Sequence, residues 1–189
     1  INTECNEAFL KTLPHRKFYD LSIIYRIEFP NGSVIISRDL MERYDLTEPK
    51  LYALAKENIA RDHPLLVSMD GDPLYAISNK ENRYGANAFL FPEKFAEIAE
   101  ILKDDLYILP SSIHELLFVR ASLFSGEEEA LLEIVRDANE ISVSIEDFLS
   151  NTVYFYERKE VEFDLMTERQ RRRKSPLFLL QDRILGERK

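Results

Sequence analysis

The sequence Leu106-Tyr107-Ile108-Leu109-Pro110-Ser111-Ser112-Ile113-His114-Glu115-Leu116-Leu117-Phe118-Val119 decides the fold. Its two apolar runs, 106–109 and 113–119, are rich in residue types that favour β-strands. The residues between them include a proline and two serines, which are typical of a turn. We therefore predict two strands of one sheet on either side of a polar segment, defined here as residues 110–115.

Outward from this segment, hairpin pairs of strands alternate with helices. Strand patterns occupy residues 18–29, 34–36, 65–69, 74–78 and 152–156. Apolar residues at helical spacing predict helices over 4–13, 47–62, 92–102 and 125–138. Asn31-Gly32 between two apolar runs is a strong hairpin signal. Because hairpins make antiparallel neighbours, we predict an α+β fold: a mixed, largely antiparallel sheet, several packed helices and a charged C-terminal extension.

Composition is that of one globular domain. The chain has 189 residues, of which 45% are hydrophobic and 31% charged, so it can bury a substantial core. No apolar run approaches the ~18 residues that a membrane-spanning helix needs, and we expect no membrane segment.

The single cysteine, Cys5, excludes an intramolecular disulfide. We expect a cytoplasmic protein; a periplasmic or secreted protein without its signal is the alternative. Because the chain begins with Ile1 rather than Met, we also expect sequence upstream.

Charge is distributed unevenly along the chain. The net charge is −9, yet residues 158–189 carry ten Lys or Arg against six Asp or Glu. Residues 1–157 carry 15 basic and 28 acidic residues. Such an acidic body argues against nonspecific duplex binding, because phosphates are neutralised by clustered basic side chains. We predict a domain over 1–158 and a basic extension over 159–189.

Three interpretations of the extension stay open. It is a solvated or disordered end, or it docks on the acidic body of its own chain or of a second copy, or it contacts nucleic acid. The stretch from Arg169 to Leu185 combines a basic run with apolar residues compatible with one helical face, which favours docking or self-association.

The polar segment holds the residue types of a hydrolase. Ser111 or Ser112 would supply the nucleophile, His114 the base and Glu115 an orienting acid. However, if 113–119 is a strand, His114 and Glu115 point to opposite faces of the sheet. The G-x-S-x-G pattern is also absent. We therefore favour a turn whose hydroxyls accept hydrogen bonds from backbone N–H groups, with ligand binding as a second possibility.

Sequence signals for metal or nucleotide binding are weaker than the hydrolase signal of the polar segment. His15, His63 and His114 are far apart, and Asp70 and Asp72 match only part of a calcium loop. With 5 glycines there is no glycine-rich phosphate loop. We predict no metal and no cofactor.

Two further segments are candidates for binding. The loop with Asn79, Asn82, Arg83, Tyr84 and Gly85 combines polar and aromatic residues, although most such loops are solvated connections. In the helix over 47–62, Asn58 lies seven residues after Leu51. It should therefore share the buried stripe and need hydrogen-bond partners there.

Five segments carry a family resemblance: PHRKFYDLSIIYRI (14–27), LYALAKENIARDHP (51–64), YAISNKENRYGANAFLFP (75–92), DLYILPSSIHELLFV (105–119) and LSNTVYFYER (149–158). Together they resemble an uncharacterised bacterial domain-of-unknown-function family with a YILPSSxHE signature, common in Gram-positive gut bacteria and mobile elements. The resemblance covers residues 6–158 and implies no activity, cofactor or substrate. It does imply a shared site at matching positions: His15, Arg16, Asn58, Asn79, Gly85, Ser111, Ser112, His114 and Glu115.

From these observations we expect a macromolecule-binding domain with an acidic surface and a protein partner, and not an enzyme. One version of this hypothesis is that the acidic surface imitates nucleic acid. A hydrolase or small-ligand enzyme using His114 with Ser111 or Ser112 is the alternative. A nucleic-acid-associated protein acting through the basic extension is the second alternative.

Overall fold

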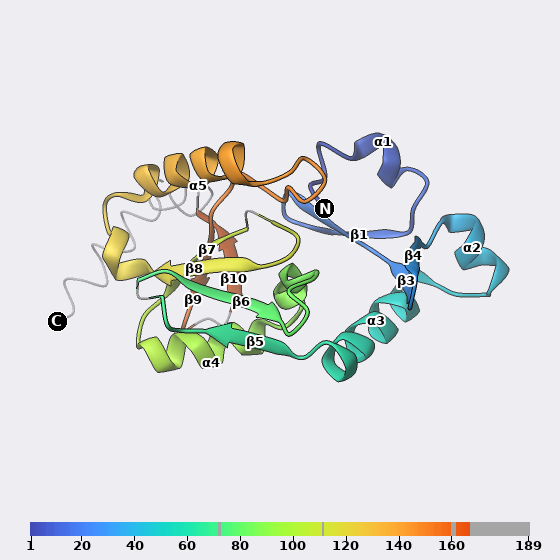
Figure 1. The fold of residues 1–189 in the computed structure, drawn as a ribbon, viewed down its shortest axis with the longest axis horizontal. Helices are drawn as coiled ribbons and strands as arrows, with labels where there is room; N and C mark the ends of the chain where they lie inside the picture. Colours follow the sequence, from blue (N-terminus) through green and yellow to red (C-terminus); the bar gives the residue numbers. More distant parts are fainter. Residues whose placement is uncertain (72, 111, 160–161, 167–189) are drawn as a thin grey trace, which may run out of the picture.

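A six-stranded sheet forms the centre of the molecule (Figure 1). The computed structural model describes residues 1–71, 73–110, 112–159 and 162–166. The strands follow the order β10-β9-β7-β8-β6-β5, and all pairs are antiparallel within the described residues. They are β5 (Leu65–Ser68), β6 (Tyr75–Asn79), β7 (Leu106–Leu109), β8 (Leu116–Arg120), β9 (Tyr154–Glu157) and β10 (Glu162–Leu165). The predicted α+β class with a largely antiparallel sheet is confirmed.

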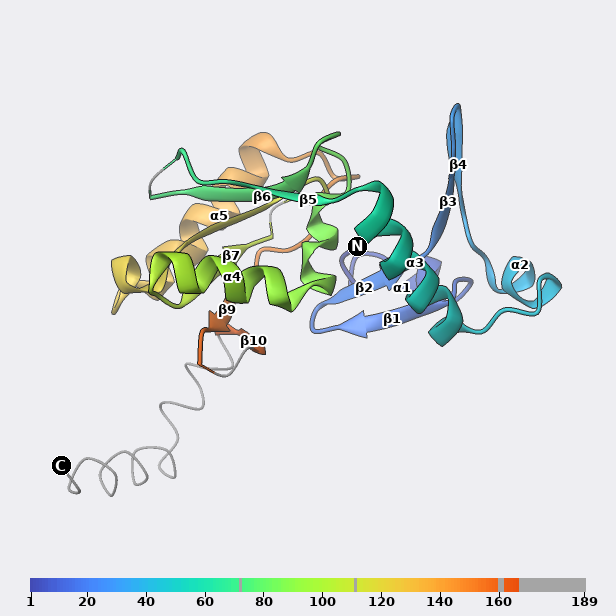
Figure 2. The same ribbon diagram turned by 90° about the horizontal axis from the view of Figure 1, so that it is seen from below.

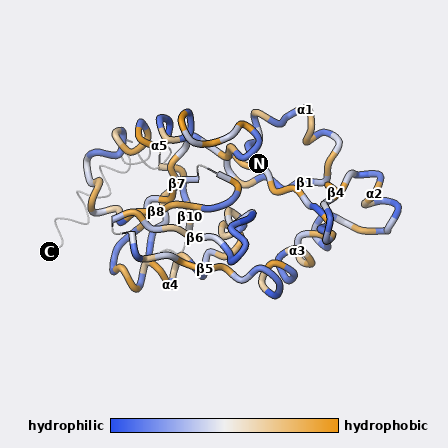
Figure 3. Tube along the Cα trace, in the orientation of Figure 1, coloured by the Kyte–Doolittle hydropathy of each residue, from blue (hydrophilic) through white to orange (hydrophobic). Residues whose placement is uncertain are grey.

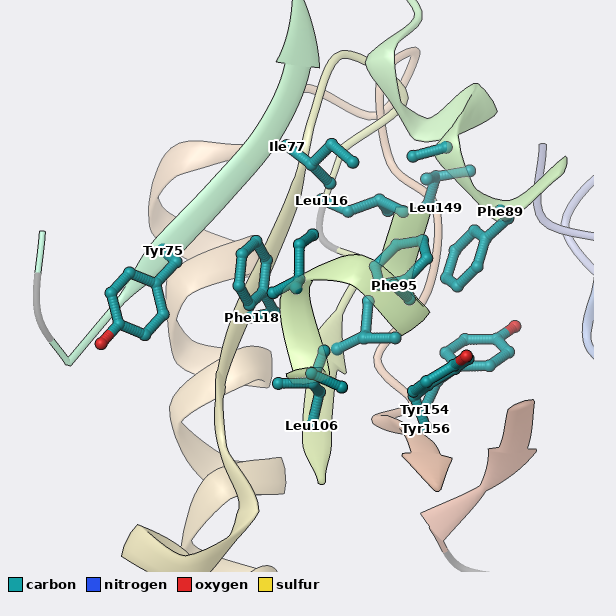
Figure 4. Close-up of a cluster of buried hydrophobic side chains, with 14 of the residues drawn as sticks. Tyr75, Ile77, Phe89, Phe95, Leu106, Leu116, Phe118, Leu149, Tyr154 and Tyr156 are labelled. Atoms are coloured by element: carbon teal, nitrogen blue, oxygen red, sulfur yellow. The ribbon is translucent and has the colours of Figure 1, made fainter. Parts of the chain in front are cut away.

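Helices α4 (Pro92–Leu102) and α5 (Glu128–Ser142) cover the two faces of this sheet (Figures 1 and 2). The other helices are α1 (Glu7–Leu10), α2 (Arg38–Arg43) and α3 (Glu48–Asp62), together with the 3-10 helices η1 (Gly85–Leu90) and η2 (Ala121–Phe124). Side chains of a strand alternate between faces. Ile108 of β7 accordingly belongs to the same buried cluster as Phe95 of α4, whereas its neighbour Tyr107 belongs to the cluster of Leu131 of α5. Figure 4 shows the first of these clusters, with Phe95 labelled. The sheet is thus the middle of three layers.

The N-terminal residues form a smaller part at one end of the sheet. It contains two hairpins, β1 (His15–Phe18) with β2 (Leu21–Ile24) and β3 (Arg26–Phe29) with β4 (Gly32–Ile35). Tyr25, Ile36 and Leu51 are the buried residues of its own core. The β1–β2 hairpin also joins the main core, because the Phe18 ring lies 5.1 Å from that of Phe89. The β3–β4 hairpin projects away from the body (Figure 2).

Two elements of this part differ from the sequence prediction. The strand pattern over 18–29 is broken at Tyr19, whose φ of 52° turns the chain back after β1. One predicted strand therefore becomes three, although the hairpin at Asn31-Gly32 is confirmed. The helix predicted over 4–13 is limited to Glu7–Leu10.

Asn58 does not lie on the buried stripe of α3, so that prediction is wrong. Its side chain is exposed and accepts a hydrogen bond from Arg61 at 3.0 Å. The packed face of α3 is rotated toward Tyr52 and Ala55, and the Arg16 guanidinium covers the Tyr52 ring at 3.9 Å. The rotation leaves Leu54 and Asn58 on the solvent side.

Helix α5 is rotated in a similar way relative to its prediction. Leu131 and Val135 are buried as expected, whereas Ile134 and Ala138 are exposed. Asn139 is buried in their place because its amide donates hydrogen bonds of 2.9 Å to the Ser150 carbonyl and to the Asn151 side chain. Ser125-Gly126-Glu127-Glu128 has the spacing of a capping box, yet the residue before the helix is Glu127, which makes no side-chain cap. Figure 3 shows hydrophilic and hydrophobic residues alternating along the helix.

The sheet continues beyond Arg158 into the segment that the sequence analysis assigned to the extension. Strand β10 pairs with β9 from Glu162↔Glu157 to Leu165↔Tyr154. Phe163 of β10 packs against the rings of Phe89, Phe95 and Tyr156 at 5.1–5.5 Å. The backbone carbonyl of Phe163 also accepts a hydrogen bond from the Tyr19 hydroxyl. These contacts make β10 part of the globular core.

We expect Phe163→Ala to lower the free energy of unfolding by about 2 kcal/mol, because a partly buried ring with three aromatic neighbours is lost. Urea denaturation followed by circular dichroism measures this change. Phe9→Ala is the matched control, since Phe9 is exposed and its loss should cost less than about 0.5 kcal/mol. Equal effects of the two substitutions would show that β10 is not part of the core.

Candidate functional site

The polar segment forms a loop rather than the start of a strand. Strand β8 begins at Leu116, so the prediction of a strand from 113 is wrong for its first three residues. Their backbone groups pair with two other loops: the Ile113 N–H donates to the Asp147 carbonyl at 2.8 Å, and the Ile113 carbonyl accepts from the Ala86 N–H at 3.2 Å. Ser111 lies outside the described residues.

The backbone carbonyl of His114 joins the polar segment to the end of β6. It accepts hydrogen bonds from the Ser78 hydroxyl at 2.7 Å and from the Gly85 N–H at 2.9 Å. A Cβ atom on Gly85 would lie 2.4 Å from both the His114 carbonyl oxygen and the Ser78 Oγ. Only glycine therefore fits at position 85, because a larger side chain would overlap these two oxygen atoms.

The His114 imidazole joins the same loops through its side chain. Its Nε2 lies 3.1 Å from Asp147 Oδ1, and its Nδ1 accepts a long hydrogen bond of 3.4 Å from the Tyr84 N–H. Since a backbone N–H can only donate, the neutral ring carries its proton on Nε2 and donates it to Asp147. The two side chains are 36% and 38% exposed, so the pair lies at the surface.

This arrangement differs from that of a hydrolase. Both imidazole nitrogens of His114 contact groups other than a hydroxyl. The Ser112 hydroxyl instead accepts the backbone N–H of His114 at 2.9 Å, which is the turn contact that the sequence analysis favoured. Glu115 is exposed at the end of the segment. The geometry suits holding three loops together better than activating a nucleophile.

The loop of residues 79–85 is fixed by its own side chains. Asn79 is buried, and its amide both donates to the Arg83 carbonyl at 2.7 Å and accepts from the Arg83 N–H at 3.1 Å. Asn82 and Tyr84 have φ values of 48° and 57°. For a bulky residue such as tyrosine this backbone conformation is strained, and strain of this kind persists where the surroundings enforce it.

Two arginines flank the exposed side of this loop. The Tyr84 ring stacks on His114 with centroids 5.8 Å apart and planes at 28°. The guanidinium carbons of Arg26 and Arg83 lie 4.6 and 5.0 Å from the centre of the same ring. Arg83 also lies 3.9 Å from the carboxylate of Glu28 on β3. The loop thereby contacts the β3–β4 hairpin. We call Arg26, Arg83 and Tyr84 the Arg–Tyr cluster.

The remaining candidates belong to the N-terminal part. His15 contacts the Leu13 carbonyl at 3.1 Å, and Arg16 makes two hydrogen bonds of 3.0 Å to Glu48. The Tyr25 hydroxyl donates to the same carboxylate. The Arg16 hydrogen bond holds the pKa of Glu48 below its ordinary value, whereas burial and the bond to Glu48 raise the pKa of Tyr25. These contacts fasten β1 to α3 and give Arg16 a structural role.

Among the described residues, no three His, Cys, Asp or Glu side chains converge on a point where a metal ion could bind. Within the same residues no helix has both the length and the apolar character to cross a bilayer. A pocket of about 620 Å³ lies between the N-terminal residues and 148–152, with Asn2, Lys17, Asp20 and Ser150 in its lining. None of the candidate residues from the sequence lines this pocket.

Comparison with known proteins identifies a family whose function is unknown. The sequence matches the profile of a family of unknown function, DUF5688, over residues 1–71 and 66–158. The chain belongs to this family. No curated protein and no solved structure matches it. The expected membership of a domain-of-unknown-function family is thereby confirmed.

In this DUF5688 chain the structure brings together Asn79, Gly85, Ser112 and His114, with Glu115 beside them. Asp147 could not be predicted from the sequence, because it is 33 residues from His114 and carries no local motif. The contact of Arg26 with Tyr84 could not be predicted either, because Arg26 lies in the β3–β4 hairpin and Tyr84 in the loop after β6. The αL conformation of Tyr84 was equally hidden, since tyrosine is not a residue that signals it.

We expect Gly85→Ala to lower the free energy of unfolding of the DUF5688 domain by about 1–3 kcal/mol, because the new methyl group overlaps two oxygen atoms. Urea denaturation measures the loss. Adding Ser78→Ala removes one of those oxygens, so the double variant should lose less than the sum of the two single variants. Simple additivity would contradict the steric explanation.

A second prediction concerns pH. Because the pKa of Glu48 is lowered on folding, its stabilisation is complete above the ordinary carboxyl pKa of about 4.5 and disappears as the pH falls through the lower folded value. Wild type should therefore exceed Glu48→Gln in stability at pH 7, and the difference should shrink steadily below about pH 5. Thermal unfolding between pH 7 and pH 3 measures it. Glu57→Gln, on the exposed side of the same helix, is the control. A constant difference would contradict the assignment.

Proposed function

We propose that this DUF5688 domain is a protein-binding module whose recognition surface is the Arg–Tyr cluster. The observation that carries the proposal is Tyr84 itself. It is held in a left-handed backbone conformation, with its ring between His114 and the guanidinium groups of Arg26 and Arg83. Strained residues on rigid loops support a role in recognition.

The residue types of the cluster suit protein recognition. Tyrosine and arginine are enriched among the residues that contribute most to binding energy at protein interfaces. Tyr84 is fixed before binding by its stacking on His114, and the Arg83 backbone by the two Asn79 hydrogen bonds. A surface that is already ordered loses little conformational entropy when a partner binds.

The β3–β4 hairpin extends the surface next to the cluster. Arg26 and Glu28 lie on the face of the hairpin that contacts the 79–85 loop. On the opposite face Ile27 pairs with Val34 across the strands, and Phe29 lies two residues further along. All three apolar side chains are exposed, between 40% and 55%. A partner that contacts this hairpin can bury apolar area together with the charged cluster.

The cellular setting is part of the same proposal. We place the domain in the cytoplasm, because its single cysteine is exposed and unpaired, as is usual where thiols stay reduced. The association with bacteria and mobile elements is supported by the sequence resemblance. The hydrolase alternative has less support, since Asp147 and the Tyr84 N–H engage the two imidazole nitrogens of His114. The nucleic-acid alternative depends on basic residues outside the described part of the chain.

The test is affinity capture from a lysate of the source organism, followed by titration of the captured protein against purified variants. We expect the double variant Arg83→Ala/Tyr84→Ala to bind at least about 30-fold more weakly than wild type, the loss typical of residues central to an interface.

The matched control is Arg43→Ala/Tyr44→Ala, which removes the same residue pair from the end of α2. Tyr44 is 66% exposed, and this variant should keep wild-type affinity. Circular dichroism checks that both variants are folded. Equal affinity of the two double variants, or the absence of any captured protein, would contradict the proposal.

A further inference from the structure

Helix α5 has a second apolar face that no described residue covers. Ile134 and Ile141 are 53% and 83% exposed, and Ile145, just after the helix, is 93% exposed. Ile134 and Ile141 are seven residues apart, or two helical turns, so they lie on the same side of α5. This side flanks the buried stripe of Leu131 and Val135. We call Ile134, Ile141 and Ile145 the isoleucine face.

Acidic residues surround the isoleucine face. Residues 127–147 contain eight carboxylates and a single basic residue, Arg136. Exposed apolar side chains that gather on one face with a polar rim often mark a place of contact. With this charge, the best occupant is a segment that combines apolar and basic side chains.

The chain itself contains such a segment. Residues 167–189 carry eight Lys or Arg against three Asp or Glu. Five of the eight lie in the run 169–174. The apolar residues follow shortly after this run: Phe178, Leu179, Leu180, Ile184 and Leu185. Charge and hydropathy of this segment therefore complement those of α5.

The point where the described chain ends agrees with this pairing. Met166 is buried in the same cluster as Leu131 and Val135, so the described chain ends close to α5. Residues 167–177 can reach up to about 36 Å when extended. The 15 residues of α5 span only about 22 Å. The apolar residues from 178 onward can therefore reach any part of the isoleucine face.

We propose that residues 167–189 of the same chain bind the isoleucine face of α5. The basic run pairs with the surrounding carboxylates, and the apolar residues cover Ile134 and Ile141. Binding within one chain is favoured over binding between two copies, because the short connection to Met166 gives the segment a high effective concentration near α5. This proposal is independent of the Arg–Tyr cluster.

Disulfide cross-linking in the full chain tests the proposal. In a Cys5→Ser background, Ile141→Cys is combined with Leu180→Cys, and the protein is oxidised at low concentration. The control pair is Ile101→Cys with Leu180→Cys, because Ile101 is an isoleucine of α4 that is 70% exposed. Cys5, Ile141 and Ile101 are all exposed, and position 180 lies in the C-terminal segment, so the substitutions should leave the fold intact.

We expect a cross-linked monomer that forms at least about tenfold faster for the α5 pair than for the α4 pair. The rate should fall when the salt concentration is raised from 50 to 500 mM, because salt screens the attraction between the basic run and the carboxylates. Equal rates for the two pairs would overturn the proposal. A product that is mainly a cross-linked dimer would overturn binding within one chain, and a rate independent of salt would remove the role of charge.

Discussion

The backbone carbonyl of His114 is the contact on which the position of the Arg–Tyr cluster depends. It accepts hydrogen bonds from Ser78 and Gly85, and it is so close to position 85 that no side chain fits there. These bonds fix where the chain leaves β6, and so they determine where Tyr84 lies. The His114 imidazole also connects loops, because its Nε2 contacts Asp147 and its Nδ1 accepts a hydrogen bond from the Tyr84 N–H. One residue therefore positions three loops with its main chain and its side chain together.

The fold class could be predicted from sequence because the strongest signals are local. The apolar runs of β7 and β8 and the Asn31-Gly32 turn each specify a strand or hairpin by themselves. The errors arose where tertiary contacts override a local pattern. The packed face of α3 includes Tyr52, whose ring Arg16 covers, and the Asn139 amide replaces an apolar residue at the buried face of α5. Neither partner is visible in the sequence of the helix concerned.

The candidate site could be predicted only in part, for a related reason. His114, Gly85 and Asn79 stand in segments with family resemblance, and the structure does bring them together. What these residues do depends on Ser78, whose position follows from the pairing of β6 with β8, and on Asp147, which lies in the turn after α5. Neither position follows from spacing along the chain. The residues that looked like a hydrolase are consecutive in sequence, and the loop they form directs the Ser112 hydroxyl to a backbone N–H.

The strand order has a consequence for folding. β5–β6 and β7–β8 are pairs of neighbours in sequence and can form early, whereas β6–β8 and β7–β9 pair residues about 40 to 50 positions apart. Closing such long loops slows folding, and contacts of this kind tend to form late. The loops around His114 meet only after both distant pairings exist. Their contacts should therefore be absent from the transition state, so that changes there accelerate unfolding and leave the folding rate almost unaltered.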